Sequence, residues 1–366
     1  MVNHRRSVTV IVPVYRTEPY LAECLQSLVD QTYTDFRIAV VDDGSPGDCE
    51  EIVRTYQAIR PNIAYIRLEE NRGTFYAHVL GVRQSSSDYV AFLDSDDTAR
   101  SHFIETLIKA ADETGADIVG CSTTRQNSGN FSVEGTENVV NALGSRRIPN
   151  HKLWCKLFKR RLFEQSPELD ELAERRRVIF EDLVITTTIF TKAKSYYHVD
   201  DVLVNYKKDR IDSVSNDISL KKLYEQAKAL PHFAEHLAKT LNKFEDVRTA
   251  ILERSLGFFY ARKLHRVDLI SRDRILSKLL ETSHSQAMLL VIAKMADSRL
   301  RITRRKLKEY RAKAKDLHLA CERLKSRNRY LRERLRVAKQ KVSHMKEQNS
   351  ELRKSQAPKQ STETSA

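Results

Sequence analysis

The chain has 366 residues, five cysteines and a formal net charge of +14, a length that suffices for two domains with a sizeable core. The longest apolar run, Ala287–Ala293, is too short to cross a bilayer. The cysteines are widely separated and form no C-x-x-C pair, so the sequence indicates neither a disulfide framework nor a zinc site.

The charge is concentrated in one part of the chain. Residues 1–296 carry 41 basic and 41 acidic side chains, whereas residues 297–356 carry 21 basic and 7 acidic ones. The start of the sequence lacks the long apolar segment and cleavage site of a secretory signal. We therefore expect a cytoplasmic location, with possible peripheral contact at the inner face of the plasma membrane.

The first part of the chain alternates between two hydrophobic patterns. β-Branched runs typical of buried strands alternate with segments of helical periodicity. The strands are expected at residues 7–14, 36–42, 63–69, 88–94 and 117–121, and the helices at 18–31, 49–59, 74–85 and 101–115. This alternation predicts a mostly parallel sheet with helices on both faces. Residues 122–216 have a mixed pattern, in which residues 178–193 form a loop that enters a helix.

The remainder of the chain is predicted to be helical. Residues 217–296 indicate a small helical subdomain with a break at Pro231. Residues 297–355 carry apolar side chains at alternating spacings of three and four, which predicts a basic coiled coil. Asn328 and Asn349 fall at the same heptad position and favour a parallel homodimer, although a single helix packed on its own domain is the alternative. Residues 356–366 are polar and expected to be disordered.

The basic coiled coil has three candidate roles. It could pair two copies of the chain, contact an anionic membrane, or hold an anionic acceptor polymer. Dimerisation ranks first, and membrane contact ranks second as an addition to it. Each basic residue near an anionic surface would contribute about 1 kcal/mol to that contact. Nucleic acid is not an expected partner, because basic zipper proteins place their basic region before the heptads, whereas here the charge runs along them.

Aspartates follow two of the predicted strands. Ligands in open α/β sheets bind at the carboxyl ends of the strands, and carboxylates gathered there repel one another unless a cation or donors lie between them. Oxygen ligands of this kind suit Mg²⁺ or Mn²⁺, which would be shared with substrate phosphates. The alternative is that an aspartate only caps a helix or closes a turn. The clusters are Asp42 with Asp43, and Asp94 with Asp96 and Asp97.

Several motifs in order resemble the family 2 glycosyltransferases, which have the GT-A fold. The resemblance starts with "VTVIVPVYRTEPYLAECLQSLVDQTYTDFRIAVVDDGS" and continues through "ENRGTFYAHVLG", "YVAFLDSDD", "KLWCKLFKRRLF", "FEDLV" and "NYKKDRIDSVS". It covers roughly residues 8–215 and implies an α/β GT-A domain with a Rossmann-like mixed sheet over residues 1–216. The helical subdomain (217–296), the coiled coil (297–355) and the tail (356–366) lie beyond it.

The resemblance also implies roles for individual residues. Asp42 would accept from the uracil ring, Asp94 would contact the ribose, and Asp96 would ligate the Mn²⁺ or Mg²⁺ that bridges the diphosphate. Asp182 would be the catalytic base, with Glu181 the second choice, and Trp154 would line the acceptor side. The residues implied in nucleotide-sugar binding are Pro13, Tyr15, Glu18, Asp42, Asp43, Arg72, Asp94, Asp96 and Lys156.

At one place the sequence departs from the family. Many members have Arg-Asn after "NRGTFYA", where this chain has His78 and Val79. A contact usually made there is therefore absent or replaced by His78, and the alternative is that His78 is a core residue.

These features together predict an inverting, metal-dependent transfer. The sugar would pass from a nucleotide-diphosphate donor, with UDP as first choice, to a hydroxyl of a cell-envelope glycan or glycolipid. Two other interpretations stay open: an inactive scaffold that acts through its basic coiled coil, and a nucleotidyltransferase that uses a similar sheet. No G-x-G-x-x-G follows the first strand, so a dinucleotide enzyme is not indicated.

Overall fold

The computed structural model describes residues 6–123, 129–148, 152–174, 178–207 and 220–262. The predicted coiled coil and tail, and the predicted helical subdomain after residue 262, lie outside the described residues and stay predictions. Within the described residues, no helix is both long enough and apolar enough to cross a bilayer.

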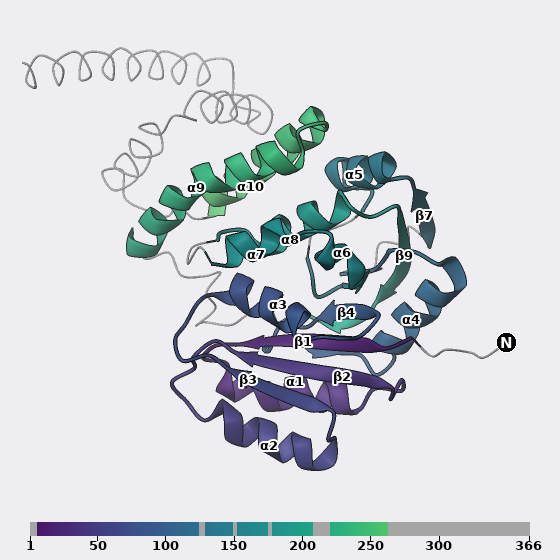
Figure 1. The fold of residues 1–366 in the computed structure, drawn as a ribbon, viewed down its shortest axis with the longest axis vertical. Helices are drawn as coiled ribbons and strands as arrows, with labels where there is room; N and C mark the ends of the chain where they lie inside the picture. Colours follow the sequence, from purple (N-terminus) through teal and green to yellow (C-terminus); the bar gives the residue numbers. More distant parts are fainter. Residues whose placement is uncertain (1–5, 124–128, 149–151, 175–177, 208–219, 263–366) are drawn as a thin grey trace, which may run out of the picture. The chain divides into compact units, whose positions relative to one another are not determined.

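The first part of the described chain alternates strands and helices as expected. The elements are β1 (Val8–Val14), α1 (Glu18–Val29), β2 (Phe36–Asp42), α2 (Cys49–Ile59), β3 (Ile63–Arg67), α3 (Thr74–Arg83), β4 (Tyr89–Phe92), β5 (Thr98–Ala99), α4 (Phe103–Thr114) and β6 (Ile118–Ser122). The predicted strands and helices of this part are all present (Figure 1). The short β5 was not expected.

The second part mixes short strands with helices. Its elements are β7 (Phe131–Glu134), α5 (Thr136–Ser145), β8 (Lys156–Lys159), α6 (Arg161–Glu164), α7 (Glu168–Ala173), α8 (Glu181–Phe190), β9 (Ser195–Val202), β10 (Val204–Asn205), α9 (Leu220–Thr240) and α10 (Glu245–Arg262). The predicted entry into a helix within residues 178–193 is confirmed by α8. The predicted break at Pro231 is wrong, because α9 continues through it. Phe233 and Leu237 of α9 are buried in the core, and this packing offsets the backbone hydrogen bond that a proline removes.

One mixed sheet of eight strands organises the fold. Its order is β3-β2-β1-β4-β8-β6-β9-β7. Strands β1 to β4 are parallel, and β8 is inserted antiparallel between β4 and β6. The carboxyl ends of β1, β2, β3 and β4 therefore lie at one edge, together with the start of β8. The predicted mixed α/β sheet is confirmed. A separate ribbon joins β5 to β10 in antiparallel pairing.

Two layers of buried side chains cover the two faces of the sheet. Helices α1, α2 and α4 contribute to one core, and α3, α5, α8, α9 and α10 contribute to the other. Figure 1 shows α1 and α2 on one side of β1 to β3, with α3 on the opposite side. Gly81 allows α3 to lie close to β1, since a Cβ there would stand 2.5 Å from Ile11 Cγ2.

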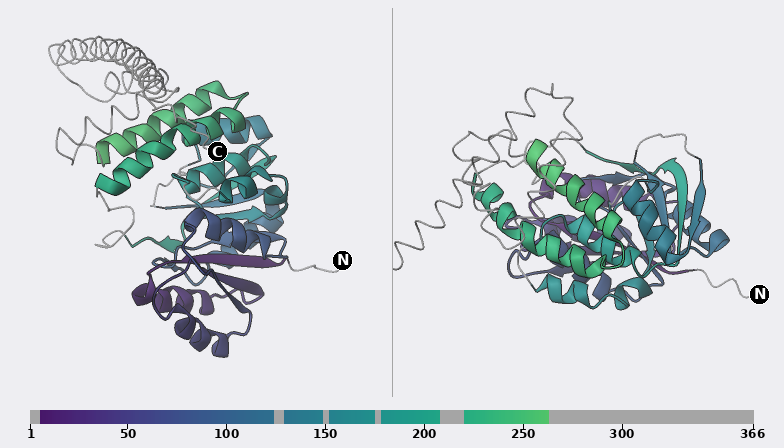
Figure 2. Two further views of the ribbon diagram at one scale, coloured as in Figure 1. Left: turned by 60° about the vertical axis from the view of Figure 1, so that its left-hand side comes forward. Right: turned by 90° about the horizontal axis from the view of Figure 1, so that it is seen from above.

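The last two described helices extend the second core. Helix α9 packs on α8, α10 packs on α5, and the two helices lie side by side (Figure 2). Gly144 of α5 is in close contact with Val247 of α10, because a Cβ at Gly144 would come 2.8 Å from Val247 Cγ2.

Candidate active site

A tight turn after β4, the acidic turn (Asp94–Asp97), gathers three carboxylates. The backbone N–H of Asp97 donates to the carbonyl of Asp94 at 2.9 Å, which closes the turn. One carboxylate oxygen from each of Asp94, Asp96 and Asp97 lies within 4.8 Å of the others. This donor set contains only oxygen, the ligand type that Mg²⁺ and Mn²⁺ prefer. The three side chains therefore fit a hard divalent cation, and they include the predicted metal ligand.

Asp182 reaches the site from the first turn of α8. Phe180, just before the helix, has a φ of 54°, a left-handed conformation that is costly for a bulky residue. Its ring packs against Phe233 of α9 at a centroid distance of 5.0 Å, which helps to hold that conformation. The helix then begins with Glu181 and Asp182, where carboxylates interact favourably with the helix dipole.

A lysine that was not predicted lies beside Asp182. The ammonium nitrogen of Lys152 is 3.3 Å from Asp182 Oδ2, and both side chains are only partly exposed. Burial lowers the pKa of Lys152, but the carboxylates of Asp182 and Asp94 outweigh burial and raise that pKa overall. Lys152 therefore stays charged and links the predicted catalytic base to the acidic turn.

The acidic turn is electrostatically strained despite this lysine. Burial raises the pKa of Asp94 well above its usual value, and repulsion from Asp182 raises it further. Asp97 and Asp96 act in the same direction, whereas Lys152 acts against them. Negative charge is in excess here, so a bound cation would stabilise the ionised form of Asp94.

The aspartates after β2 accept several hydrogen bonds from within the chain. Asp42 is completely buried and accepts hydrogen bonds from the Ser45 N–H at 2.8 Å and the Tyr65 hydroxyl at 2.5 Å. These two bonds use about half of the acceptor positions of the Asp42 carboxylate, which has no exposed surface in this structure.

Asp43 holds the following loop in place. Its two oxygens accept from the backbone N–H groups of Arg72 at 2.6 Å and Gly73 at 2.8 Å. Burial raises the pKa of Asp43, and the two backbone hydrogen bonds lower it. Gly73 has a φ of 94°, which suits glycine. These contacts support the alternative in which Asp43 is a structural residue of the turn.

The other residues predicted to bind the nucleotide-sugar donor lie in or after β1 and after β3, near the carboxyl ends of the strands. Pro13 is buried within β1, and Tyr15 is half-buried directly after the strand. Glu18, the first residue of α1, lies against Gly47, where a Cβ would come 2.5 Å from Glu18 Oε1. The guanidinium of Arg72 lies 3.7 Å above the Tyr76 ring.

Two residues of the "KLWCK" stretch, Lys156 and Trp154, are buried. Lys156 is 1% exposed, and its ammonium donates to the Lys152 carbonyl at 2.6 Å. It therefore braces the turn that carries Lys152, rather than facing the solvent where a diphosphate would arrive. Trp154 is 4% exposed and lies beneath the ring of Tyr206, at a centroid distance of 5.7 Å.

Lys152 and Tyr206 are the site residues that sequence reasoning missed. Both belong to motifs already used for the resemblance, "KLWCKLFKRRLF" and "NYKKDRIDSVS". The motif alone does not show which of two lysines, or which of two aromatic rings, faces outwards. That choice depends on the direction in which β8 enters the sheet.

His78 is a buried core residue with unusual surroundings. It is 2% exposed and packs edge-on against Phe92 at a centroid distance of 5.1 Å. Neither ring nitrogen has a hydrogen-bond partner among the described residues. Burial lowers the pKa of His78 to about 4, and Asp182 acts in the opposite direction. The imidazole is therefore neutral at pH 7.

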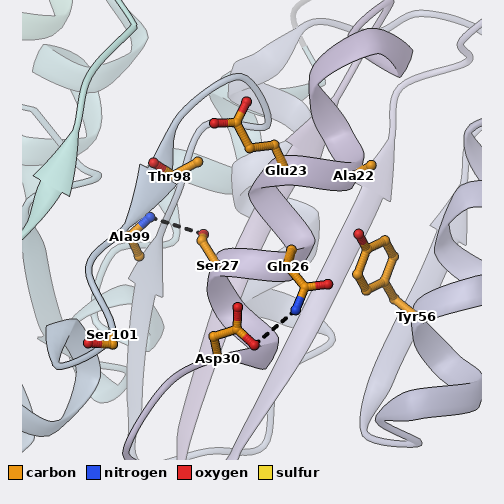
Figure 3. A pocket seen from close by; sticks show the side chains of 9 residues that line it. All are labelled: Ala22, Glu23, Gln26, Ser27, Asp30, Tyr56, Thr98, Ala99 and Ser101. Carbon is orange, nitrogen blue, oxygen red and sulfur yellow. Dashed lines mark hydrogen bonds between the residues drawn. The ribbon is translucent and has the colours of Figure 1, made fainter.

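An open groove of about 570 Å³ lies outside this set of residues. It is formed by the outer side of α1, by Tyr56 of α2 and by the β5 region (Figure 3). A hydrogen bond from the Ala99 N–H to Ser27 Oγ joins its two sides at 3.0 Å. None of the predicted site residues lines this groove.

Comparison with known proteins identifies the family of this domain. The sequence of residues 9–170 matches the family described as Glycosyl transferase family 2. The chain contains a family 2 glycosyltransferase domain. The matched range includes the acidic turn, the Lys152 turn and the donor-side residues, and the resemblance inferred from the motifs is confirmed.

The relatives cover different shares of the chain. The glycosyltransferase GlyA of Streptococcus pneumoniae is 35% identical over 175 residues, which are 43% of this chain and 25% of that protein. The uncharacterised glycosyltransferase EpsJ of Bacillus subtilis is 30% identical over 216 residues, 55% of this chain and 61% of that protein. The chain thus spans less than two thirds of the length of each of these two relatives.

A solved structure shares the fold. Residues 1–349 of S. aureus TarS, in complex with UDP-GlcNAc, superpose with a TM-score of 0.58 at 19% identity. The match covers 80% of this chain and 85% of that one. At this identity the comparison shows a shared fold.

Proposed function

We propose that this chain is an inverting glycosyltransferase. It transfers a sugar from a nucleoside-diphosphate donor, with UDP as first choice, to a hydroxyl of a cell-envelope glycan or glycolipid. The observation that carries the proposal is the Asp182–Lys152 pair beside the three carboxylates of the acidic turn. The family 2 domain and the fold shared with a UDP-GlcNAc-bound protein support the class of donor.

The donor nucleotide would occupy the loops after β1, β2 and β3. A ring N–H of the base would donate to Asp42, while Asp43 fixes the backbone of the Arg72 loop. Tyr15 and Glu18 close the side of β1. A nucleoside lying here would direct its diphosphate toward the turn after β4, because β1 lies between β2 and β4 in the sheet.

Asp94, Asp96 and Asp97 would hold Mn²⁺ or Mg²⁺. The ion would act as a Lewis acid that offsets the charge developing on the departing diphosphate. The contribution of this chain is to present three oxygen ligands from one short turn, with the backbone of Asp97 already bonded to Asp94.

Asp182 would take the proton from the acceptor hydroxyl. A base must lie within reach of that proton, and the first turn of α8 places Asp182 next to the acidic turn. Lys152 keeps the carboxylate oriented through its 3.3 Å contact. One displacement at the anomeric carbon would invert its configuration, and alignment of the hydroxyl with the leaving group supplies much of the rate gain.

Calorimetry with a panel of donors tests the proposal. UDP-, GDP- and CDP-linked sugars are titrated into the protein with Mn²⁺ and then with chelator. We expect one donor class to bind more tightly with Mn²⁺, and we expect Asp96→Asn to lose that difference. The matched control is Asp35→Asn, which removes an exposed carboxylate just before β2. Equal binding of every donor with Mn²⁺ and with chelator would reject the function.

The proposal extends to partners and location. The heptads of residues 297–355 would pair two copies of the chain, and their basic side chains would add contact with anionic lipid at the inner face of the plasma membrane. Light scattering of the full chain is expected to give a dimer mass. Sedimentation with anionic vesicles at low and high salt tests the membrane contact separately.

A further inference from the structure

An exposed aromatic ring lies on top of a buried one beside the candidate active site. The rings of Trp154 and Tyr206 are nearly parallel, with an interplanar angle of 6° and centroids 5.7 Å apart. Trp154 is 4% exposed, whereas Tyr206 is 44% exposed. Among the described residues, Tyr206 and Ile59 are the large hydrophobic side chains that stand exposed. The buried ring therefore supports an aromatic face that is open to solvent.

The backbone on both sides of Tyr206 is tied to the acidic turn. Strand β10 ends at Asn205 and pairs with β5, which directly follows that turn. The N–H of Lys207 donates to Asp97 Oδ1 at 2.8 Å, and Asn205 Nδ2 donates to Thr98 Oγ1 at 3.3 Å. The ring is thus held in place before any ligand arrives, which reduces the entropy lost on binding.

Charged groups of the candidate active site act on the Tyr206 phenol. Burial raises the pKa of the Tyr206 phenol, and Lys152 lowers it. The carboxylates of Asp97 and Asp94 also act on the phenol. Lys152 pairs with the predicted base Asp182, and Asp94 and Asp97 belong to the acidic turn.

The order of the sheet separates this ring from the predicted donor loops. The donor residues follow β1 and β2, which lie on one side of β4. Trp154 precedes β8, which lies on the other side of β4 and runs antiparallel to it. The acidic turn after β4 therefore lies between the two sets, with Trp154 on the β8 side of that turn.

We propose that Tyr206, supported from below by Trp154, is the platform on which a pyranose ring of the acceptor stacks. The inference rests on the proposed function, since it assumes a carbohydrate acceptor that delivers its hydroxyl to Asp182. A pyranose carries C–H groups on its ring face, and covering an aromatic ring with that face removes apolar surface from water. The hydroxyls around its rim stay free for polar contacts, so the platform selects for ring sugars over acyclic polyols.

The test reads the fluorescence of Trp154, which is the single tryptophan of the chain. The full chain is titrated with methyl β-D-glucopyranoside and methyl N-acetyl-β-D-glucosaminide, with and without UDP and Mn²⁺. Ribitol has hydroxyls but no ring face and is the control ligand. We expect a saturable change with at least one pyranoside and none with ribitol.

Substitutions at the platform give the sharper comparison. Tyr206→Phe keeps the aromatic face and should bind the pyranoside like the unaltered chain. Tyr206→Leu should weaken it about tenfold. Ile59→Leu, at the end of α2, is the matched exposed control. If the Leu variant fails to fold in thermal unfolding, Tyr206→Met replaces it.

Three results would overturn the platform: no saturable response in the unaltered chain, an equal response to ribitol, or unchanged affinity in Tyr206→Leu. Donor calorimetry separates this failure from that of the proposed function. Donors that bind with Mn²⁺ while pyranosides give no response reject only the platform. A pyranoside response without any donor binding rejects only the glycosyl transfer.

Discussion

Two aspartates at opposite ends of the strands of one sheet have opposite surroundings. Asp117 stands just before β6 and is 3% exposed. It accepts from Lys159 at 2.9 Å, from Arg161 at 2.6 Å and from the Lys194 N–H at 2.8 Å. Burial raises the pKa of Asp117, but these hydrogen bonds outweigh burial and lower it overall. This carboxylate is neutralised and joins three segments of the chain.

Asp94, after β4, shows the reverse. Burial and three neighbouring carboxylates raise its pKa, and Lys152 offsets only part of the repulsion. Burial alone therefore does not mark a functional carboxylate. The two sites differ in whether the fold supplies enough positive charge to compensate the carboxylate. At the carboxyl end of β4 negative charge stays in excess.

The largest expected effect is the loss of turnover in Asp182→Asn. An amide has no basic oxygen to accept the acceptor proton, so kcat should fall roughly 1,000-fold while donor affinity stays nearly intact. Steady-state kinetics and donor calorimetry check the two halves. Near-normal turnover would show that another group, with Glu181 the next choice, is the base.

Asp117→Asn should give the complementary result. Removing the charge leaves Lys159 and Arg161 without their buried partner, so the free energy of unfolding should fall by about 2–4 kcal/mol. Turnover per folded molecule should not change. Denaturant unfolding and kinetics at low temperature measure both. A loss of turnover at full stability would erase the distinction between the two sites.

His78 tests whether uncompensated groups near Asp182 reduce stability. Its pKa of about 4 in the folded protein lies below the ordinary value of 6.5. Between those values the unfolded chain takes up a proton that the folded one refuses, so stability is lost as pH falls from 6.5 to 4, by up to about 3 kcal/mol. His78→Leu should remove this part of the acid loss.

Unfolding curves at pH 7 and pH 4.5 measure the effect. His102→Leu, an exposed histidine just before α4, is the control. An acid loss in His78→Leu as large as in the unaltered chain would show that the imidazole titrates normally in the fold.

The smallest effect is expected for Asp94→Asn without metal. Because the folded chain holds the Asp94 proton more tightly than the unfolded chain, stability decreases as pH rises from the ordinary carboxyl pKa toward the raised one. The amide should therefore raise stability by about 1 kcal/mol, with a larger gain at pH 8 than at pH 5. Thermal unfolding at both pH values checks it. Destabilisation at pH 8 would contradict the excess of negative charge.

Local patterns predicted most of the first half of the fold. The β-branched runs of β1 and β2 are buried along nearly their whole length, so a short apolar segment was enough to identify each strand. The insertion of β8 between β4 and β6 was not predictable, because it depends on long-range pairing of four residues. The continuity of α9 through Pro231 likewise depends on tertiary packing.

The site was predicted by residue type better than by orientation. Acidic residues at strand ends indicated the turn after β4, and the resemblance supplied Asp182 as its partner. The exchange of Lys156 for Lys152, and of Trp154 for Tyr206, was beyond sequence reasoning. In each pair the two side chains are of similar chemistry, and only the packed structure determines which one is covered.

The packing of α9 and α10 has a practical consequence for fragments of this protein. Phe233 and Leu237 of α9, Leu241 just after it, and Val247 and Ile251 of α10 fill the same core as α8. A recombinant chain cut at residue 216 would bare the apolar surface that these side chains cover and would be prone to aggregate. Expression of the catalytic region should therefore extend at least to Arg262.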